Sequence, residues 1–323
     1  MRTDRLRPFL VNRHQAPTSR AAMPSMPHDP SDRPAPHSPL LDIVIVSWEG
    51  HADRSRYIAR QVDGLAGVRL RVVYSNRAEA RETGPGLWQQ VPDDCYFGRK
   101  FEAALQGFDS DVLMIVQADA LCTDWPAVVT RCRQRFAERP QLGLWTPRIA
   151  YSPWLPERVD VRRVSGQAVT NVAQTDAIVL AFSRATVQRL ACLDYACNNI
   201  GWGIDWIAIC HCYTQGLEVL REDALQVVHP PSRGYDCREA VRQWRVFMQQ
   251  LNAAEAAMFA ILLRYTTERR RGPWARLRLA FIRGRWRREA RCLALALSDA
   301  GPPPRLQFGV RPSPEPHPHP PAT

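Results

Sequence analysis

Runs of hydrophobic residues that end abruptly in polar ones recur along residues 41–228, with helical patterns between them. Uninterrupted β-branched and aliphatic runs of this length are typical of strands buried on both faces of a sheet. The runs predict strands over 41–47, 68–74, 112–116, 142–146, 175–182 and 217–228. Apolar positions at helical spacing predict a helix ending near 65 and others over 95–106, 125–137, 184–192 and 207–214. This alternation predicts an α/β fold with a mostly parallel central sheet and right-handed crossovers.

Three segments between the predicted elements contain prolines, and two of them also contain glycine. Residues 79–94 contain a Gly-Pro-Gly sequence and a further proline, which predict a loop. Residues 147–164 are expected to be irregular, and irregular segments of this kind often line a site. Residues 230–235 follow a predicted strand and have the composition of a mobile lid.

The two ends of the chain differ in composition from the middle. Residues 1–39 and 300–323 are rich in proline and polar residues, which bury too little apolar area to offset chain entropy, so we expect both to be disordered. Residues 40–236 are expected to form the α/β domain. Residues 237–299 are expected to form a helical, Arg-rich extension, because the apolar positions from 238 to 264 follow helical spacing.

The positive charge is concentrated near the C-terminus. The chain carries a net charge of +11, and the segment Arg264–Arg291 alone holds eleven Arg against two Glu. Three interpretations stay open for this segment: a solvated basic face, an interfacial helix on anionic lipid, and a surface that attracts nucleic-acid phosphates. The Trp, Phe and Leu residues between the arginines favour an anionic membrane surface. An Arg patch alone carries no sequence information, so no specific nucleic-acid partner is expected.

Cysteine usage and hydropathy indicate a cytoplasmic protein, peripheral on the inner membrane face if the basic segment binds lipid. The nine cysteines form no Cys-x-x-Cys pair, and several lie in apolar stretches, which favours a reducing compartment. The N-terminus lacks an apolar signal core, and no run approaches the roughly 18 apolar residues that span a bilayer. Cys210-His211-Cys212 looks like a zinc site, but such neighbours point to different faces of a helix.

The carboxyl end of the central predicted strand is the first candidate site. Val112–Val116 is uninterrupted hydrophobic sequence, followed directly by Gln117-Ala118-Asp119. Ligands of open α/β sheets bind at the carboxyl ends of strands, and a carboxylate there suits a hard divalent cation on a diphosphate. The alternative is that Asp119 only caps the helix predicted to begin near Asp124.

The second candidate site is the turn Asn198-Asn-Ile-Gly-Trp-Gly-Ile-Asp205. Two glycines around Trp202 permit a tight turn with close backbone approach, and Asp205 is placed in the first turn of the following helix. Asp205 therefore either serves a site or stabilises the helix N-terminus, and Trp202 either faces a sugar or packs in the core. His229 ends a predicted strand, where a lone histidine is either a ligand or merely hydrogen-bonded.

The strand ending at Asp119, the Gly-Trp-Gly-Ile-Asp turn and His229 together resemble the GT-A nucleotide-sugar glycosyltransferases, especially the family 2-like inverting and galactosyltransferase-like enzymes. The resemblance covers roughly residues 41–236 and implies a GT-A, Rossmann-like fold, here with a basic helical C-terminal extension. It implies that Asp119 and His229 bind Mn²⁺ or Mg²⁺ on the donor diphosphate. This chain departs from the family's Asp-x-Asp pattern, because Gln117 occupies the first acidic position.

The resemblance also implies roles at the donor and acceptor sides. Asp205 matches the family's catalytic base, although Ile204 stands where the family has Glu. Trp202 and Gly203 match the acceptor-binding part of the motif. The residues expected to bind the donor are Ser47, Glu49, Ser75, Asn76, Lys100, Gln117 and Asp119.

The function implied is an inverting glycosyltransferase of hexosyltransferase type. It would move a sugar from a nucleotide-diphosphate donor to a glycan or lipid-linked acceptor, with bacterial surface polysaccharide synthesis as the expected process. Two alternatives stay open. One is a nucleotidyltransferase, which would share the sheet and the metal carboxylate. The other is a metal-independent binding module for a glycan or membrane, which Gln117 and Ile204 favour because both replace expected acids.

Overall fold

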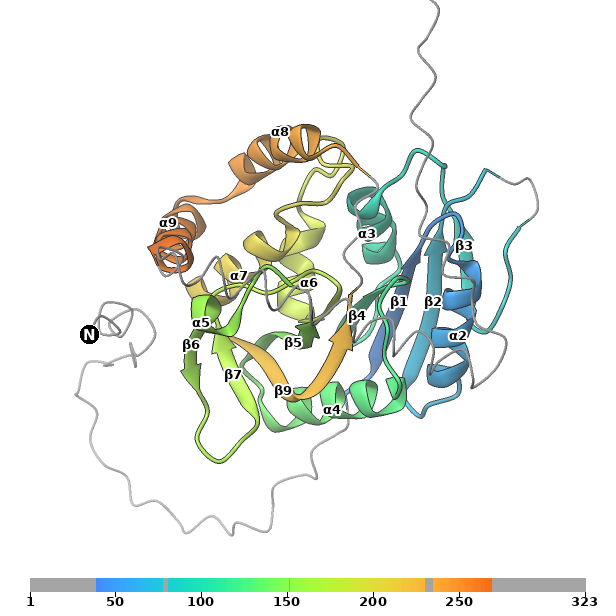
Figure 1. Ribbon diagram of the computed structural model, residues 1–323, viewed down its shortest axis with the longest axis horizontal. Helices are drawn as coiled ribbons and strands as arrows, with labels where there is room; N and C mark the ends of the chain where they lie inside the picture. The colour runs from blue at the N-terminus through green and yellow to red at the C-terminus, as the bar shows by residue number, and fades with distance from the viewer. Residues whose placement is uncertain (1–38, 78–80, 151, 230–234, 269–323) are drawn as a thin grey trace, which may run out of the picture.

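A computed structural model describes residues 39–77, 81–150, 152–229 and 235–268, and its centre is a mixed sheet covered on both faces by helices (Figure 1). Within these residues the sheet has nine strands in the order β3-β2-β1-β4-β8-β5-β9-β7-β6. The strands are β1 (Leu41–Ser47), β2 (Val68–Tyr74), β3 (Leu87–Gln90), β4 (Val112–Gln117), β5 (Leu142–Ala150), β6 (Asp160–Arg163), β7 (Val169–Val172), β8 (Val179–Ser183) and β9 (Glu218–Val228).

The sheet is mixed and not purely parallel, so the expectation of a mostly parallel sheet is confirmed only in part. Strands β1 to β4 are parallel to their neighbours within that group, and β5 is parallel to β9. However, β8 runs antiparallel between β4 and β5, and the β6–β7 and β7–β9 pairs are also antiparallel. Hydrophobic patterning could not reveal this, since Val179–Phe182 of β8 is as fully buried as a central parallel strand.

Alternate residues of the strands feed two separate cores. On one face Ile43 and Ile45 pack with helices α2 (Ala52–Val62) and α4 (Trp125–Glu138). On the other face Val44 and Val46 pack with α3 (Phe97–Leu105), α6 (Arg184–Ala191) and α7 (Ile204–Thr214). This period-two division explains why β1 is buried at every position.

The predicted strands and helices are present, and the differences lie in short or irregular segments. The predicted loop 79–94 contains the edge strand β3, and the predicted irregular segment 147–164 contains the end of β5, helix α5 (Pro156–Val159) and strand β6. Strand β8 begins at Val179 rather than at 175. The missed strands have only four residues each, too few to show a clear hydrophobic period.

Two helices follow the described end of the lid segment and pack against the same core as α7. Helix α8 (Cys237–Phe247) leads through a short 3₁₀ turn, η2 (Met248–Gln250), into α9 (Ala253–Glu268). Phe247 of α8 and Met258 and Leu262 of α9 are buried in the cluster that contains α7. The described part of this C-terminal region therefore shares a hydrophobic core with the sheet.

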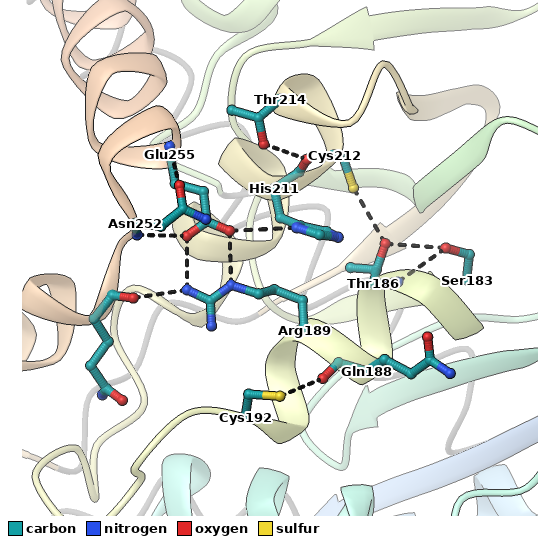
Figure 2. Close-up of polar contacts among 11 residues, drawn as sticks. Ser183, Thr186, Gln188, Arg189, Cys192, His211, Cys212, Thr214, Asn252 and Glu255 are labelled. Atoms are coloured by element: carbon teal, nitrogen blue, oxygen red, sulfur yellow. Dashed lines mark hydrogen bonds and ion pairs between the residues drawn. The ribbon is translucent and has the colours of Figure 1, made fainter.

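A buried ion pair fixes the start of α9 (Figure 2). The carboxylate of Glu255, which is fully buried, accepts hydrogen bonds at 2.8 Å from Nε and Nη2 of Arg189 on α6. Asn252 and Glu255 also form a reciprocal capping box, because each side chain accepts the other's backbone N–H. One carboxylate thus both caps α9 and anchors it to α6.

The sequence Cys210-His211-Cys212 is structural. His211 Nδ1 lies 3.4 Å from Glu255 Oε1, and Cys212 Sγ lies 3.5 Å from Thr186 Oγ1 (Figure 2). Cys210 and Cys212 are buried in the core with α7. The contacts of these three residues are with side chains and apolar groups of the protein interior.

Several predicted features lie outside the described residues. These are the leader up to residue 38, most of the lid segment, the Arg-rich segment from 269 onward and the tail. None of the helices in the described ranges combines the length and apolar character needed to cross a bilayer.

Replacing Glu255 tests the anchoring of α9. Glu255→Ala leaves Arg189 without its carboxylate and removes a helix cap, so we expect a loss of about 3 kcal/mol in the free energy of unfolding. Chemical denaturation measures this loss. The matched control is Glu239→Ala on α8, which breaks an exposed pair with Arg242 and should leave the unfolding midpoint nearly unchanged. Equal midpoints for the two variants would contradict the anchoring role.

Candidate functional site

The mixed topology brings the predicted site residues to one edge of the sheet. Strands β1, β2, β4 and β9 all end there, because β8 reverses direction between the two parallel groups. Ser47, Ser75 and Asp119 follow or end the first three of these strands, and His229 follows β9. Since β8 is antiparallel, the residues that precede it lie at the same edge. That edge carries the candidate site.

Asp119 is a buried carboxylate that faces His229. It is 8% exposed, and its Oδ2 lies 3.1 Å from Nε2 of His229. Its Oδ1 has no hydrogen-bond partner among the described residues. The cap of α4 is supplied instead by Asp124, which accepts the N–H of Ala127 at 2.9 Å. The capping interpretation of Asp119 is therefore excluded.

Basic groups keep Asp119 ionised. Burial alone would raise the pKa of this carboxyl group, but the charges of His229, His51 and Arg54 outweigh it and hold the pKa below its usual value. Burial acts to lower the pKa of His229, yet Asp119 raises it above the usual value. The edge therefore concentrates several positive groups around one negative group.

Four residues predicted to bind the donor line a single cavity of about 110 Å³. Its walls come from the ends of β1 and β2 and from the start of α2. The lining residues are Ser47, Trp48, Glu49, Gly50, Ala52, Tyr74, Ser75, Asn76 and Glu82. Ser47 is fully buried, and its hydroxyl has no partner among the described residues. The cavity is thus lined by hydroxyl, amide, carboxylate and aromatic groups.

Lys100 and Gln117, also predicted at the donor side, are both held by neighbours. The ammonium of Lys100 lies 5.3 Å from the ring centroid of Trp48, and burial lowers its pKa to about 8. Gln117 donates from Nε2 to the carbonyl of Ala177 at 2.7 Å. Lys100 therefore contacts Trp48, a residue that lines this cavity, whereas Gln117 holds the segment before β8.

The Gly-Trp-Gly turn is locked against the start of α3. Asn198 accepts the N–H of Gly201 and donates to the carbonyl of Trp202. A Cβ at Gly98 would lie 1.8 Å from the carbonyl oxygen of Asn198. Gly203 has φ +99° and lies against Met248 and Trp244, so its role is conformational. The turn sets the start of α7 and thereby the position of Asp205.

Trp202 and Asp205 point in different directions from this turn. The indole of Trp202 donates to the hydroxyl of Tyr235 at 2.9 Å. Oδ2 of Asp205 accepts a hydrogen bond from Nε2 of Gln174 at 2.7 Å, and Oδ1 accepts the N–H of Trp206. Burial and the neighbouring Asp176 raise the pKa of Asp205 to about 7. Asp205 is partly buried and lies in the first turn of α7, the position from which the alternative interpretation has it stabilise the helix N-terminus.

Asp176 is a site residue that the sequence analysis missed. The charge of Asp176 interacts with those of Asp119 and His229, and also with that of Asp205. No direct hydrogen bond joins Asp119 to Asp205 in the described residues, and Asp176 interacts electrostatically with both acids. An acidic residue inside the predicted strand 175–182 was the available signal, because an acid is unexpected in a strand buried on both faces.

A second cavity opens beside Asp176. It is lined in part by Ser152, Trp154, Gln174, Thr175 and Asp176. Gln174 is 1% exposed, and its Oε1 has no hydrogen-bond partner among the described residues. The indole ring of Trp154 packs edge-on against Trp206, the neighbour of Asp205. An aromatic wall beside polar groups is suited to a sugar.

Similar folds are found among solved structures. The mannosyltransferase PcManGT from Pyrobaculum calidifontis, in complex with GDP-Man and Mn²⁺, has a TM-score of 0.52 and 15% identity, covering 84% of this chain and 80% of that one. Residues 1–349 of S. aureus TarS give 0.50 and 10%, covering 71% of each chain. The chain has the GT-A fold. No family sequence pattern matches the chain, and no curated protein matches it in sequence.

The likeness in GT-A fold confirms the resemblance drawn from the three motifs. A divalent cation fits the arrangement in one respect. Within the described ranges, Asp119 Oδ1 is a buried carboxylate oxygen without a partner, and His229 lies beside the other oxygen. The described residues contain no group of three His, Cys, Asp or Glu side chains able to hold a metal. Any cation would therefore need further ligands from a bound diphosphate or from water.

Because Gly98 packs closely against Asn198, the stability of the fold should be sensitive to a side chain added at position 98. Gly98→Ala forces the Asn198 carbonyl away and displaces the turn before Asp205, so we expect a loss of more than about 2 kcal/mol in unfolding free energy. Gly107→Ala is the control, because it has open space but a φ of +71° and so carries only the backbone cost of about 1 kcal/mol. Denaturation curves compare the two variants. A smaller loss for Gly98→Ala would show that the turn is not tightly packed.

Proposed function

We propose that this protein transfers a sugar from a nucleotide-diphosphate donor to a hydroxyl group of a glycan or lipid-linked acceptor, with inversion at the anomeric carbon. The observation that carries the proposal is that Asp176, which lines the cavity at Trp154, interacts electrostatically with both Asp119 and Asp205. A hexose donor and a role in bacterial surface polysaccharide synthesis belong to the same proposal. PcManGT, which shares the fold, was solved with GDP-Man and Mn²⁺.

The donor side is assigned to the cavity at the ends of β1 and β2. Ser47, Glu49, Ser75 and Asn76 would bind the nucleoside, and the diphosphate would extend toward Asp119. Asp119 and His229 would hold Mn²⁺ or Mg²⁺. When bound, the cation would offset the negative charge that develops on the departing nucleoside diphosphate.

Asp205 is assigned as the general base that takes the proton of the acceptor hydroxyl. Its pKa of about 7 suits this role, because a base works best when its pKa lies near the working pH. Gln174 orients its carboxylate through the 2.7 Å hydrogen bond. The acceptor would lie in the cavity beside Trp154 and Asp176, with Trp202 and Gly203 shaping the turn that positions the base.

Nucleotide binding is the first test of the proposal. Thermal unfolding is measured with UDP, GDP and CMP, each with Mn²⁺ and with EDTA. We expect one nucleotide to raise the unfolding temperature, since a ligand at 100 times its Kd contributes about 2.7 kcal/mol of stability. No shift with any nucleotide would favour a glycan-binding module. A shift with a nucleoside triphosphate, together with pyrophosphate release, would favour a nucleotidyltransferase.

Removing the base is the second test. Asp205→Asn keeps the size of the side chain but cannot accept a proton, so we expect kcat to fall at least about 100-fold while the Kd for the nucleotide stays unchanged. Turnover is followed by release of the nucleoside diphosphate. Asp109→Asn is the control, because that side chain is 83% exposed at the surface. Full turnover by Asp205→Asn would remove Asp205 from the base role.

The raised pKa of Asp205 makes both rate and stability depend on pH. The rate should rise as the pH passes through about 7, because only the ionised carboxylate accepts a proton. The folded state binds this proton more tightly than the unfolded state, so wild-type stability falls as the pH rises from about 4 to 7. Asp205→Asn lacks this loss. The difference in unfolding temperature, Asp205→Asn minus wild type, should therefore increase from pH 5 to pH 8, and calorimetry can measure it.

A further inference from the structure

Arg54 on α2 is a buried cation with almost no partners. Its residue is 7% exposed, and its one hydrogen bond to the described residues runs from Nη1 to the backbone carbonyl of Asp119, at 3.4 Å. It forms no ion pair within 4 Å in the described part of the chain. A guanidinium has five N–H donors, and buried polar groups are normally hydrogen-bonded. Most of its donors are therefore available to a ligand.

The surroundings of Arg54 are suited to an anion. The residue lies in the first turn of an 11-residue helix, where free backbone N–H groups and the helix dipole attract negative charge. The N-cap residue His51 makes no side-chain cap hydrogen bond. Ala52, at the start of the same helix, lines the donor cavity. Arg54 thus stands between the predicted nucleoside cavity and Asp119.

The groups near Asp119 have an excess of basic character. His51, Arg54 and His229 all interact electrostatically with Asp119, and Lys100 interacts with His51. The acidic groups of this set are Asp119 and Asp176. A diphosphate brings negative charge that the resident carboxylates do not supply. Among the basic groups, an arginine keeps its charge at every working pH and matches phosphate oxygens with two parallel N–H groups.

We propose that Arg54 binds the diphosphate of the nucleotide donor and supplies counter-charge to the departing nucleoside diphosphate. This inference rests on the proposed function and adds a residue to it. The bond between the anomeric carbon and the diphosphate oxygen breaks, its electron pair goes to that oxygen, and Arg54 neutralises the charge through N–H donors. The acceptor oxygen forms the new bond, and its proton goes to Asp205.

The same arrangement accounts for the glutamine at position 117. In the GT-A resemblance that position is an acid, whereas here the amide of Gln117 is committed to the Ala177 carbonyl. One acid fewer weakens cation binding, and a permanent guanidinium charge at the diphosphate offsets that loss. Arg54 therefore contributes to donor binding whether or not a divalent cation is present.

The test compares Arg54→Gln with Arg60→Gln, an exposed position on the same helix. Calorimetric titration measures the Kd of UDP, GDP, UMP and GMP for the full chain, in Mn²⁺ and in EDTA. For the nucleoside diphosphate that binds wild type, we expect Arg54→Gln to weaken binding about 10- to 100-fold in both conditions. The monophosphate should change less than about threefold. Arg60→Gln should match wild type for every nucleotide.

A conservative variant distinguishes the effect of the charge at position 54 on binding from an effect on the local fold. Arg54→Lys keeps the charge without the two-pronged geometry, so it should recover part of the lost diphosphate affinity. Equal losses for mono- and diphosphate would show that Arg54 only supports the local structure, which overturns the inference. Equal diphosphate affinity in Arg54→Gln and Arg60→Gln would also overturn the inference. If wild type binds no nucleotide in the thermal test, both the proposed function and this inference fail. That outcome is distinct from the two preceding outcomes, in which wild type does bind a nucleotide.

Discussion

A charged carboxylate that is only 8% exposed constrains the whole carboxyl edge of the sheet. An isolated buried charge is costly, so Asp119 needs positive neighbours, and these come from elements far apart in the sequence. His229 arrives at the end of β9, and His51 and Arg54 arrive at the start of α2. The fold therefore brings the ends of both parallel groups of strands to one edge of the sheet. There, basic side chains from both groups lie near the carboxylate of Asp119.

The reversed strand β8 determines what else reaches that edge. Because β8 runs antiparallel between β4 and β5, the residues before it lie beside the ends of its neighbours. Those residues include Gln174, which donates a hydrogen bond to Asp205, and Asp176, whose charge interacts with those of Asp119 and Asp205. In a sheet of purely parallel strands this segment would lie at the opposite edge. Strand direction therefore places Asp176 at the edge that carries Asp119.

The elements with long, uniform patterns were predictable from the sequence. β1, β2, β4 and α7 follow from hydrophobic runs and helix signals, and Asp119, Asp205 and His229 follow from their positions at element ends. The grouping of Ser47, Glu49, Ser75 and Asn76 in one cavity also agrees with the sequence, because parallel strands end at the same edge.

Other residues of the site could not be predicted, for definite physical reasons. Asp176 depends on the direction of β8, which burial on both faces conceals. Arg54 lies in the first turn of an amphipathic helix, where an arginine normally faces solvent, and only tertiary packing shows that it is buried. Lys100 was assigned to the donor side, but its contact with Trp48 required the packing of α3 against β1.

The hydrogen bond from Gln117 to Ala177 has a consequence for how this site could change through evolution. A carboxylate at 117 has no N–H to donate and would face the carbonyl oxygen of Ala177, so the two oxygens would repel each other. The segment that carries Asp176 would then lose this side-chain hydrogen bond and keep its backbone attachment to the end of β4. A single substitution toward the Asp-x-Asp pattern would therefore gain one acid and loosen the placement of another.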